Sequence, residues 1–194
     1  MSNDNFANPA PVGLLGFGMT TILLNFHNAG LYSLDAMILG MGVFFGGLAQ
    51  LIAGTMEFKK GNTFGQAAFM SYGAFWMLLV FLLIIPKVPV WAAYAASETA
   101  MATFFGLWGV YTFFMFIGTL NGNRATQTIF LSLTILFFLL MGRDILAAKG
   151  MVDLSKTVGH IAGYEGIFCG LSAFYTALGE ILNEKRGKTI LPLG

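Results

Sequence analysis

Charge and cysteine are scarce in this chain of 194 residues. Charged residues make up 10% of it and hydrophobic residues 57%, and the mean hydropathy is +0.76. A water-soluble domain needs more charge than this. The net charge of +1 gives no field that would attract nucleic acid. The single cysteine, Cys169, excludes an intrachain disulfide and a thiolate metal cage. We therefore expect an integral protein of the lipid bilayer, without a nucleic-acid partner.

Catalytic and metal-binding motifs are also missing. The two histidines, His27 and His160, lie in different predicted helices, and no thiolate completes a metal site with them. The sequence contains neither a glycine-rich phosphate loop nor a strand-turn-helix nucleophile motif. We expect no metal, no cofactor and no enzymatic activity.

Long apolar runs dominate the rest of the chain. A membrane-spanning helix needs about 20 mostly apolar residues, and short polar or proline-containing breaks divide the chain into six such segments. No linker is long enough to separate domains, so residues 1–194 are predicted to form one domain. The fold class is an all-α integral membrane protein whose six transmembrane helices form a compact pore-forming bundle. The predicted helices cover residues 9–26, 34–56, 66–85, 99–119, 125–148 and 158–182.

Lysine and arginine predict the orientation, because positive residues stay on the cytoplasmic side of a membrane. Six fall in breaks on the side of both termini, and four fall on the opposite side. Both termini are therefore predicted to be cytoplasmic in a multi-pass protein of the plasma (inner) membrane. The first group is Lys59, Lys60, Arg124, Lys185, Arg186 and Lys188; the second is Lys87, Arg143, Lys149 and Lys156.

Small residues form stripes on two predicted helices. In the last helix they recur at spacings of three and four, which places them on one face. Such stripes allow membrane helices to approach closely, and this packing interpretation carries most weight. The alternative is that part of the stripe lines a narrow passage, where Ala173 would set the size of the substrate. The stripes are Gly159, Gly163, Gly166, Gly170, Ala173 and Ala177, and Ala36, Gly40, Gly47 and Gly54.

The segment before the first predicted helix is polar and rich in proline. Residues 8–14 read Asn-Pro-Ala-Pro-Val-Gly-Leu, and the free amides at such a helix start carry partial positive charge that favours an anion. Pro11 and the glycines that follow it predict an interrupted helix of the kind that borders a transporter's substrate site. We expect Asn8 and Pro9 to lie at the cytoplasmic mouth.

This segment resembles the N-terminal signature of the acetate uptake transporter family, the succinate–acetate permeases, whose usual form has leucine in place of Val12. Residues 57–65, 106–109, 179–184 and 190–194 are also similar to parts of that family. The resemblance implies a homo-hexamer of six-helix protomers that moves acetate, and often succinate, across the plasma membrane.

Three bulky residues are predicted to lie at one depth. Phe17 and Leu133 each come eight residues after their helix begins, about 12 Å along the axis, and Tyr72 is slightly shallower. The family resemblance implies a hydrophobic constriction here. Its residues are Phe17 in Gly-Phe-Gly-Met-Thr-Thr, Tyr72 in Ser-Tyr-Gly-Ala-Phe-Trp and Leu133 in Leu-Ser-Leu-Thr. The alternative is ordinary packing inside a bundle.

Neutral hydrogen-bond donors surround this level, and none of them would repel an anion. With Asn8 and Pro9, we expect Thr20, Ser71 and Ala173 to contribute to a carboxylate-binding passage. Glu57, Glu98 and Glu180 lie at predicted helix ends, where solvated capping or pairing with lysine is the ordinary role. We assign them no part in transport.

Ionisable residues gather where the fifth and sixth predicted helices meet the outer side. Arg143, His160 and Glu165 lie at similar depth there, and Glu165 is expected within reach of Arg143. Buried charges usually mark a pathway or a proton relay, so one interpretation is a proton-accepting cluster or an anion-attracting mouth. The other is an interfacial salt bridge without a role in transport.

The sequence and its family resemblance thus predict a permease for acetate, with succinate as a secondary substrate and protons as a possible coupling ion. Flux through the narrow apolar constriction is either channel-like or coupled to protons. Two alternatives stay open: a hexameric channel for a neutral solute such as urea, and a membrane sensor that binds a carboxylate without moving it.

Overall fold

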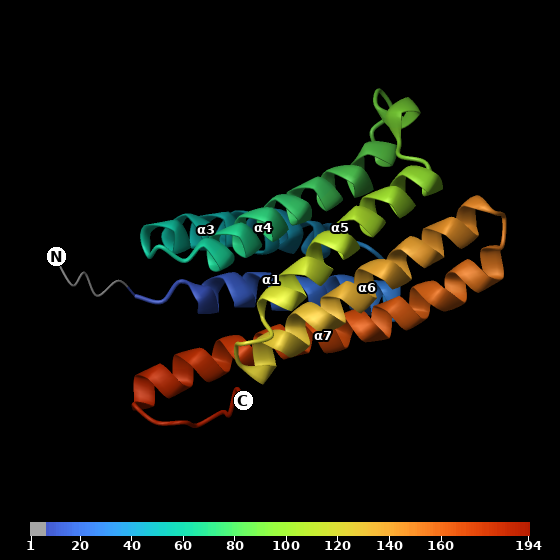
Figure 1. Ribbon diagram of the computed structural model, residues 1–194. Helices are drawn as coiled ribbons and strands as arrows, with labels where there is room; N and C mark the ends of the chain where they lie inside the picture. Colours follow the sequence, from blue (N-terminus) through green and yellow to red (C-terminus); the bar gives the residue numbers. More distant parts are fainter. Residues whose placement is uncertain (1–6) are drawn as a thin grey trace.

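The computed structural model describes residues 7–194, and within that range every regular element is helical. Six long rods run side by side along a common direction (Figure 1). The first rod is α1 (Ala10–Asn28), and the second joins α2 (Ala36–Gly40), the π-helical η1 (Met41–Ala49) and α3 (Gln50–Lys59). The others are α4 (Thr63–Ile84) with its 3-10 extension η2 (Ile85–Lys87), α5 (Glu98–Gly118), α6 (Arg124–Ala148) and α7 (Val152–Arg186); the short η3 (Ala92–Tyr94) lies in a loop.

Polar side chains fix where several of these helices begin, because the first amides of a helix have no partner within it. Asp35 accepts hydrogen bonds from the amides of Met37 and Ile38 at the start of α2. Asn62, Ser97 and Asn123 cap α4, α5 and α6 in the same way. The first five predicted helices match the observed rods to within about three residues at each end.

The last predicted helix was too short at its start. The structure ends α6 at Ala148, as predicted, but begins α7 at Val152, so the expected break over residues 149–157 shrinks to a tight turn. Gly150 makes this turn possible with a φ of 74°, a conformation that glycine adopts without strain. Hydropathy marks only the apolar part of a helix, whereas α7 continues as a hydrogen-bonded helix of 35 residues, about 52 Å at the helical rise.

The prediction of an interrupted first helix was wrong. α1 is continuous over 19 residues, and Pro11 occupies one of its first positions, where a missing N–H costs nothing. The irregular rod is instead the second, in which nine residues are π-helical. The Thr20 hydroxyl donates to the Met41 carbonyl at 3.3 Å, and the Gln50 amide donates to the Gly46 carbonyl at 2.6 Å.

Glycine allows α1 and α7 to pack backbone against backbone. A Cβ atom added to Gly18 would lie 2.8 Å from the Gly170 carbonyl oxygen, and Ala173 lies beside the same position. Ala173 is fully buried. The packing interpretation of the α7 stripe is confirmed for these residues, and the passage interpretation of Ala173 is wrong.

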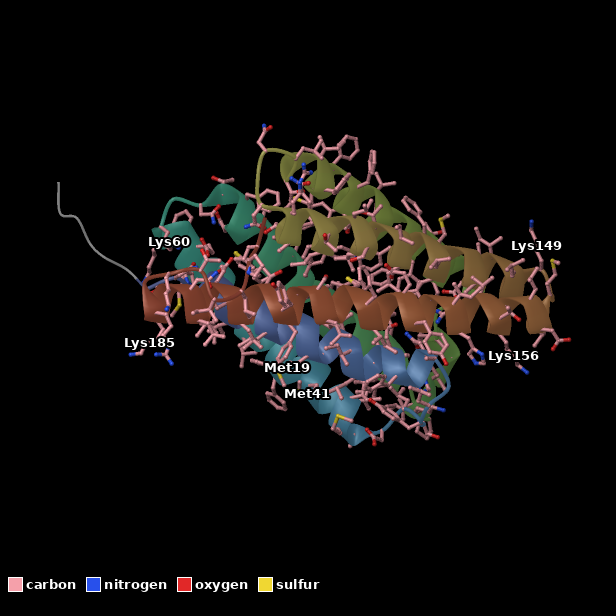
Figure 2. All side chains as sticks on the ribbon, turned by 90° about the horizontal axis from the view of Figure 1, so that it is seen from below. Met19, Met41, Lys60, Lys149, Lys156 and Lys185 are labelled. Carbon is pink, nitrogen blue, oxygen red and sulfur yellow. The ribbon has the colours of Figure 1, made fainter. Side chains whose placement is uncertain are left out.

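Five rods are long and apolar enough to cross a membrane, and α7 exceeds them in length while carrying more polar residues. Lys60 and Lys185 lie at one end of the bundle, and Lys149 and Lys156 at the other (Figure 2). The structure thus groups these lysines as the sequence predicted.

Candidate functional site

A cavity opens at the end of the bundle where α1, α4 and α6 begin and where α3 and α7 end. Its volume is about 180 Å³. Most of the wall is apolar, and the polar groups come from six side chains. The lining comprises Ala10, Leu14, Phe17, Gln50, Glu57, Asn62, Phe64, Gly65, Ala68, Phe69, Tyr72, Thr126, Ile129, Phe130, Leu133 and Glu180. We call it the inner cavity.

Phe17, Tyr72 and Leu133 come together at the deep end of the inner cavity. All three side chains are buried, and the Phe17 and Tyr72 rings lie 6.0 Å apart between centroids. A second, smaller cavity of about 30 Å³ lies beyond them, lined by the later turns of α1, α4 and α6. Phe17 and Leu133 line both cavities. These two side chains therefore stand between an inner cavity and an outer one.

The Tyr72 hydroxyl is held by a short chain of hydrogen bonds. It lies 2.9 Å from Thr112 Oγ1, and the Thr112 hydroxyl donates to the Trp108 carbonyl at 2.7 Å. Threonine has one hydroxyl proton, so Tyr72 must be the donor to Thr112. The phenol proton is thereby turned away from the inner cavity, and the wall there consists of the aromatic ring.

Two carboxyl groups face the inner cavity, contrary to the expectation that no negative group lies near the constriction. Glu57, near the end of α3, has no exposed surface; its Oε2 accepts from the Asn62 amide at 2.8 Å, whereas Oε1 has no hydrogen-bond partner among the described residues. Glu180 of α7 accepts from the Asn8 amide at 3.0 Å. Their positions inside the bundle, rather than in solvent, make them part of the site.

Asn8 lies at the mouth of the inner cavity, as expected, but its side chain is already engaged. The amide nitrogen donates to Glu180, and Oδ1 accepts from Lys60 Nζ at 3.0 Å and from the Ala10 amide at 3.3 Å. Asn8 thus joins α1, α3 and α7 at this mouth. Pro9 follows it as the cap residue of α1.

The other expected substrate contacts lie elsewhere. Thr20 is fully buried and bonded to the π-helical segment, and Ala173 is buried against α1. Ser71 lies between Phe69 and Tyr72, which line the inner cavity, but does not line it itself. These residues lie at the expected depth along their helices, but their side chains are on faces that do not line the inner cavity.

The expected cluster of Arg143, His160 and Glu165 does not form. Arg143 pairs with its neighbour Asp144 at 2.6 Å and lies 5.7 Å above the Phe105 ring. His160 lies beside Gly30. Glu165 Oε2 is buried without a partner in the described chain. The predicted contact between Glu165 and Arg143 is wrong, because Asp144 is closer along the same helix.

Metal ligands do not gather anywhere in residues 7–194: no group of three His, Cys, Asp or Glu side chains has suitable geometry. Cys169 is buried and its thiol points to the Ile129 carbonyl. The cavity chemistry is therefore that of an apolar wall with carboxyl and amide groups at one end.

Comparison with known proteins identifies the family. Residues 1–193 match the model of the GPR1/FUN34/yaaH family. The chain belongs to this family. Over 194 residues, covering 98% of the relative, it is 53% identical to the succinate-acetate/proton symporter SatP of Escherichia coli strain K12.

A more distant relative and a solved structure are also similar to this GPR1/FUN34/yaaH protein over nearly its whole length. Acetate permease A of Emericella nidulans is 33% identical over 197 residues, which are 97% of this chain and 66% of the relative. The solved structure of the bacterial acetate channel SatP matches with a TM-score of 0.91 at 52% identity. That match covers 98% of this chain and 100% of the other.

Glu57 is a cavity-lining residue of this GPR1/FUN34/yaaH protein that reasoning from the sequence did not place in the site. A signal was present: Gln50, Ala53, Gly54 and Glu57 follow one another at helical spacing and are all buried. Small and polar residues on one face indicate a face turned toward protein. The position of Glu57 at a predicted helix end, where solvated capping or pairing with lysine is the ordinary role, favours the opposite interpretation.

Proposed function

We propose that this protein transports acetate, and secondarily succinate, across the plasma membrane through the passage between the inner and outer cavities. The observation that carries the proposal is that Phe17 and Leu133 separate two cavities aligned along the bundle. An apolar constriction of this kind excludes hydrated ions by dewetting. A small, weakly acidic solute passes more easily, because its protonated form has no charge to dehydrate.

The names of the relatives support the same substrate class. SatP of Escherichia coli is called a succinate-acetate/proton symporter, and the matched solved structure is called an acetate channel. We infer that both termini are cytoplasmic, since Lys60 and Lys185 lie at the end of the bundle where α1 begins and α7 ends. We also infer a homo-hexamer, as the family resemblance implied; native mass spectrometry in detergent tests this.

Flux into proteoliposomes tests the function. Labelled acetate uptake is measured up to high concentration, with and without an imposed pH gradient. We expect uptake above that of empty vesicles and competition by unlabelled acetate and, more weakly, succinate. Saturable uptake that the gradient concentrates indicates a carrier, and linear downhill flux indicates a channel. Competition by urea but not acetate refutes the proposal, and binding without flux favours a sensor.

Leu133→Ala tests the constriction within the same assay. It removes the side chain that both cavities share, so the ratio of succinate flux to acetate flux should rise at least severalfold. The matched control is Leu131→Ala in the same helix, whose side chain is 45% exposed on the outer surface. An unchanged ratio in folded Leu133→Ala protein would show that the passage lies elsewhere.

A further inference from the structure

Glu57 occupies an unusual position for an ionisable residue. It has no exposed surface, it lines the inner cavity, and Oε1 has no hydrogen-bond partner among residues 7–194. Burying an ionised carboxylate without compensating partners is costly, and such groups inside membrane proteins usually serve transport or proton transfer. Ordinary packing does not account for this residue.

Asn62 defines which oxygen of Glu57 is available. Its amide donates to Glu57 Oε2 at 2.8 Å, while Asn62 Oδ1 accepts from the Gly65 amide at 3.0 Å. The amide is therefore fixed with its nitrogen toward Glu57. Because Oε2 already accepts this hydrogen bond, Oε1 is the oxygen left to carry a proton or to meet a ligand.

The charged groups around Glu57 do not neutralise it. Glu180 of α7 faces the same cavity and accepts from Asn8, and Glu184 lies one turn further along α7. Lys60, the cation at this mouth, donates to Asn8. The cavity-lining residues of α1, α4 and α6 carry no charge. A carboxylate substrate would thus enter a cavity that already holds two carboxyl groups.

A substrate carboxylate in contact with the Glu57 carboxyl group is stable only when the two share a proton, because two carboxylates in contact repel each other. We propose that Glu57 carries the proton that accompanies a carboxylate substrate through the inner cavity. Protonated Glu57 donates from Oε1 to the substrate carboxylate, and ionised Glu57 repels it. The proton is taken up with the substrate and released with it. Since coupling is reciprocal, substrate binding equally favours the protonated form of Glu57. This inference rests on the proposed function.

The test is the pH dependence of acetate flux in proteoliposomes, measured with equal pH on both sides. If transport of each substrate molecule requires one proton, wild-type flux should fall by up to tenfold for each unit by which the pH is raised. Glu57→Gln carries a permanent N–H donor, so its flux should change less than twofold per unit, and a pH gradient should no longer concentrate acetate. Glu98→Gln changes an exposed carboxyl group at the opposite end of the bundle, and this variant should keep the wild-type slope.

The fraction of acetate present as free acetic acid also falls tenfold for each unit of rising pH, so the wild-type slope alone does not identify the proton carrier. The pH dependence of flux in Glu57→Gln therefore decides the question. A wild-type slope in Glu57→Gln shows that the proton travels on the substrate alone and overturns the inference. Dependence of wild-type flux on Na⁺ in place of pH overturns it as well. Absence of acetate flux in the wild-type protein refutes the proposed function itself, and the inference falls with it.

Infrared difference spectroscopy on the wild-type protein provides a second measurement that needs no variant to fold. Addition of acetate should produce the carbonyl band of a protonated carboxyl group. If Glu57 holds the proton, the band stays in place when carboxyl-¹³C acetate is used. A band that shifts with the label belongs to the substrate and overturns the inference.

Discussion

Replacing Gly18 with alanine tests how closely α1 and α7 must approach. The added Cβ would lie 2.8 Å from the Gly170 carbonyl oxygen and 2.9 Å from the Phe174 amide nitrogen, whereas ordinary contact begins at 3.4 Å. Both neighbours are backbone atoms and cannot rotate away. The two helices must therefore separate locally by about 0.6 Å, the difference between 3.4 Å and 2.8 Å.

A gap of this size weakens many contacts along the interface, since a 0.5–1 Å gap loses roughly a quarter to a half of each dispersion contact. We expect Gly18→Ala to lower the free energy of unfolding by about 1–3 kcal/mol, the usual range for overpacking. The matched control is Gly142→Ala in α6, where an added Cβ meets nothing within 4 Å. Helix propensity makes that change neutral or stabilising by about 0.5–1 kcal/mol.

Reversible unfolding in mixed micelles, titrated with sodium dodecyl sulfate, measures both variants. Equal stability of Gly18→Ala and Gly142→Ala would refute the close approach of the two helices. Because Phe17 precedes Gly18, a separated α1 should also change acetate flux in the Gly18 variant and leave it unchanged in the control.

Two further changes test the surroundings of the constriction. Ala173→Leu should lower stability by about 1–3 kcal/mol without selectively changing substrate size preference, because Ala173 faces Gly18 in the α1–α7 interface; a size shift in stable protein would contradict this, and the flux ratio of succinate to acetate measures it. Thr112→Val should cost about 1–3 kcal/mol by leaving the buried Tyr72 hydroxyl without its acceptor. In a double-mutant cycle, adding Tyr72→Phe should recover part of that loss, and strictly additive losses would exclude the hydrogen bond.

Local chemistry determined much of this protein directly from its sequence. Apolar runs of bilayer length gave the six helices, and capping residues such as Asn62 and Asn123 fixed several of their starts. The small-residue stripe of α7 correctly predicted close helix packing. These properties depend on residues near one another along the chain, so periodicity and composition are enough to reveal them.

Tertiary structure decided which face of each helix meets the cavity. Thr20 and Ala173 lie at suitable positions along their helices but face η1 and α1, whereas Glu57, expected in solvent, is buried beside Asn62. Depth along a helix follows from residue number, but the neighbour that a side chain meets depends on how distant helices pair. In this bundle the backbone contact between Gly18 and Gly170 sets one such pairing, and no single helix contains the information that specifies it.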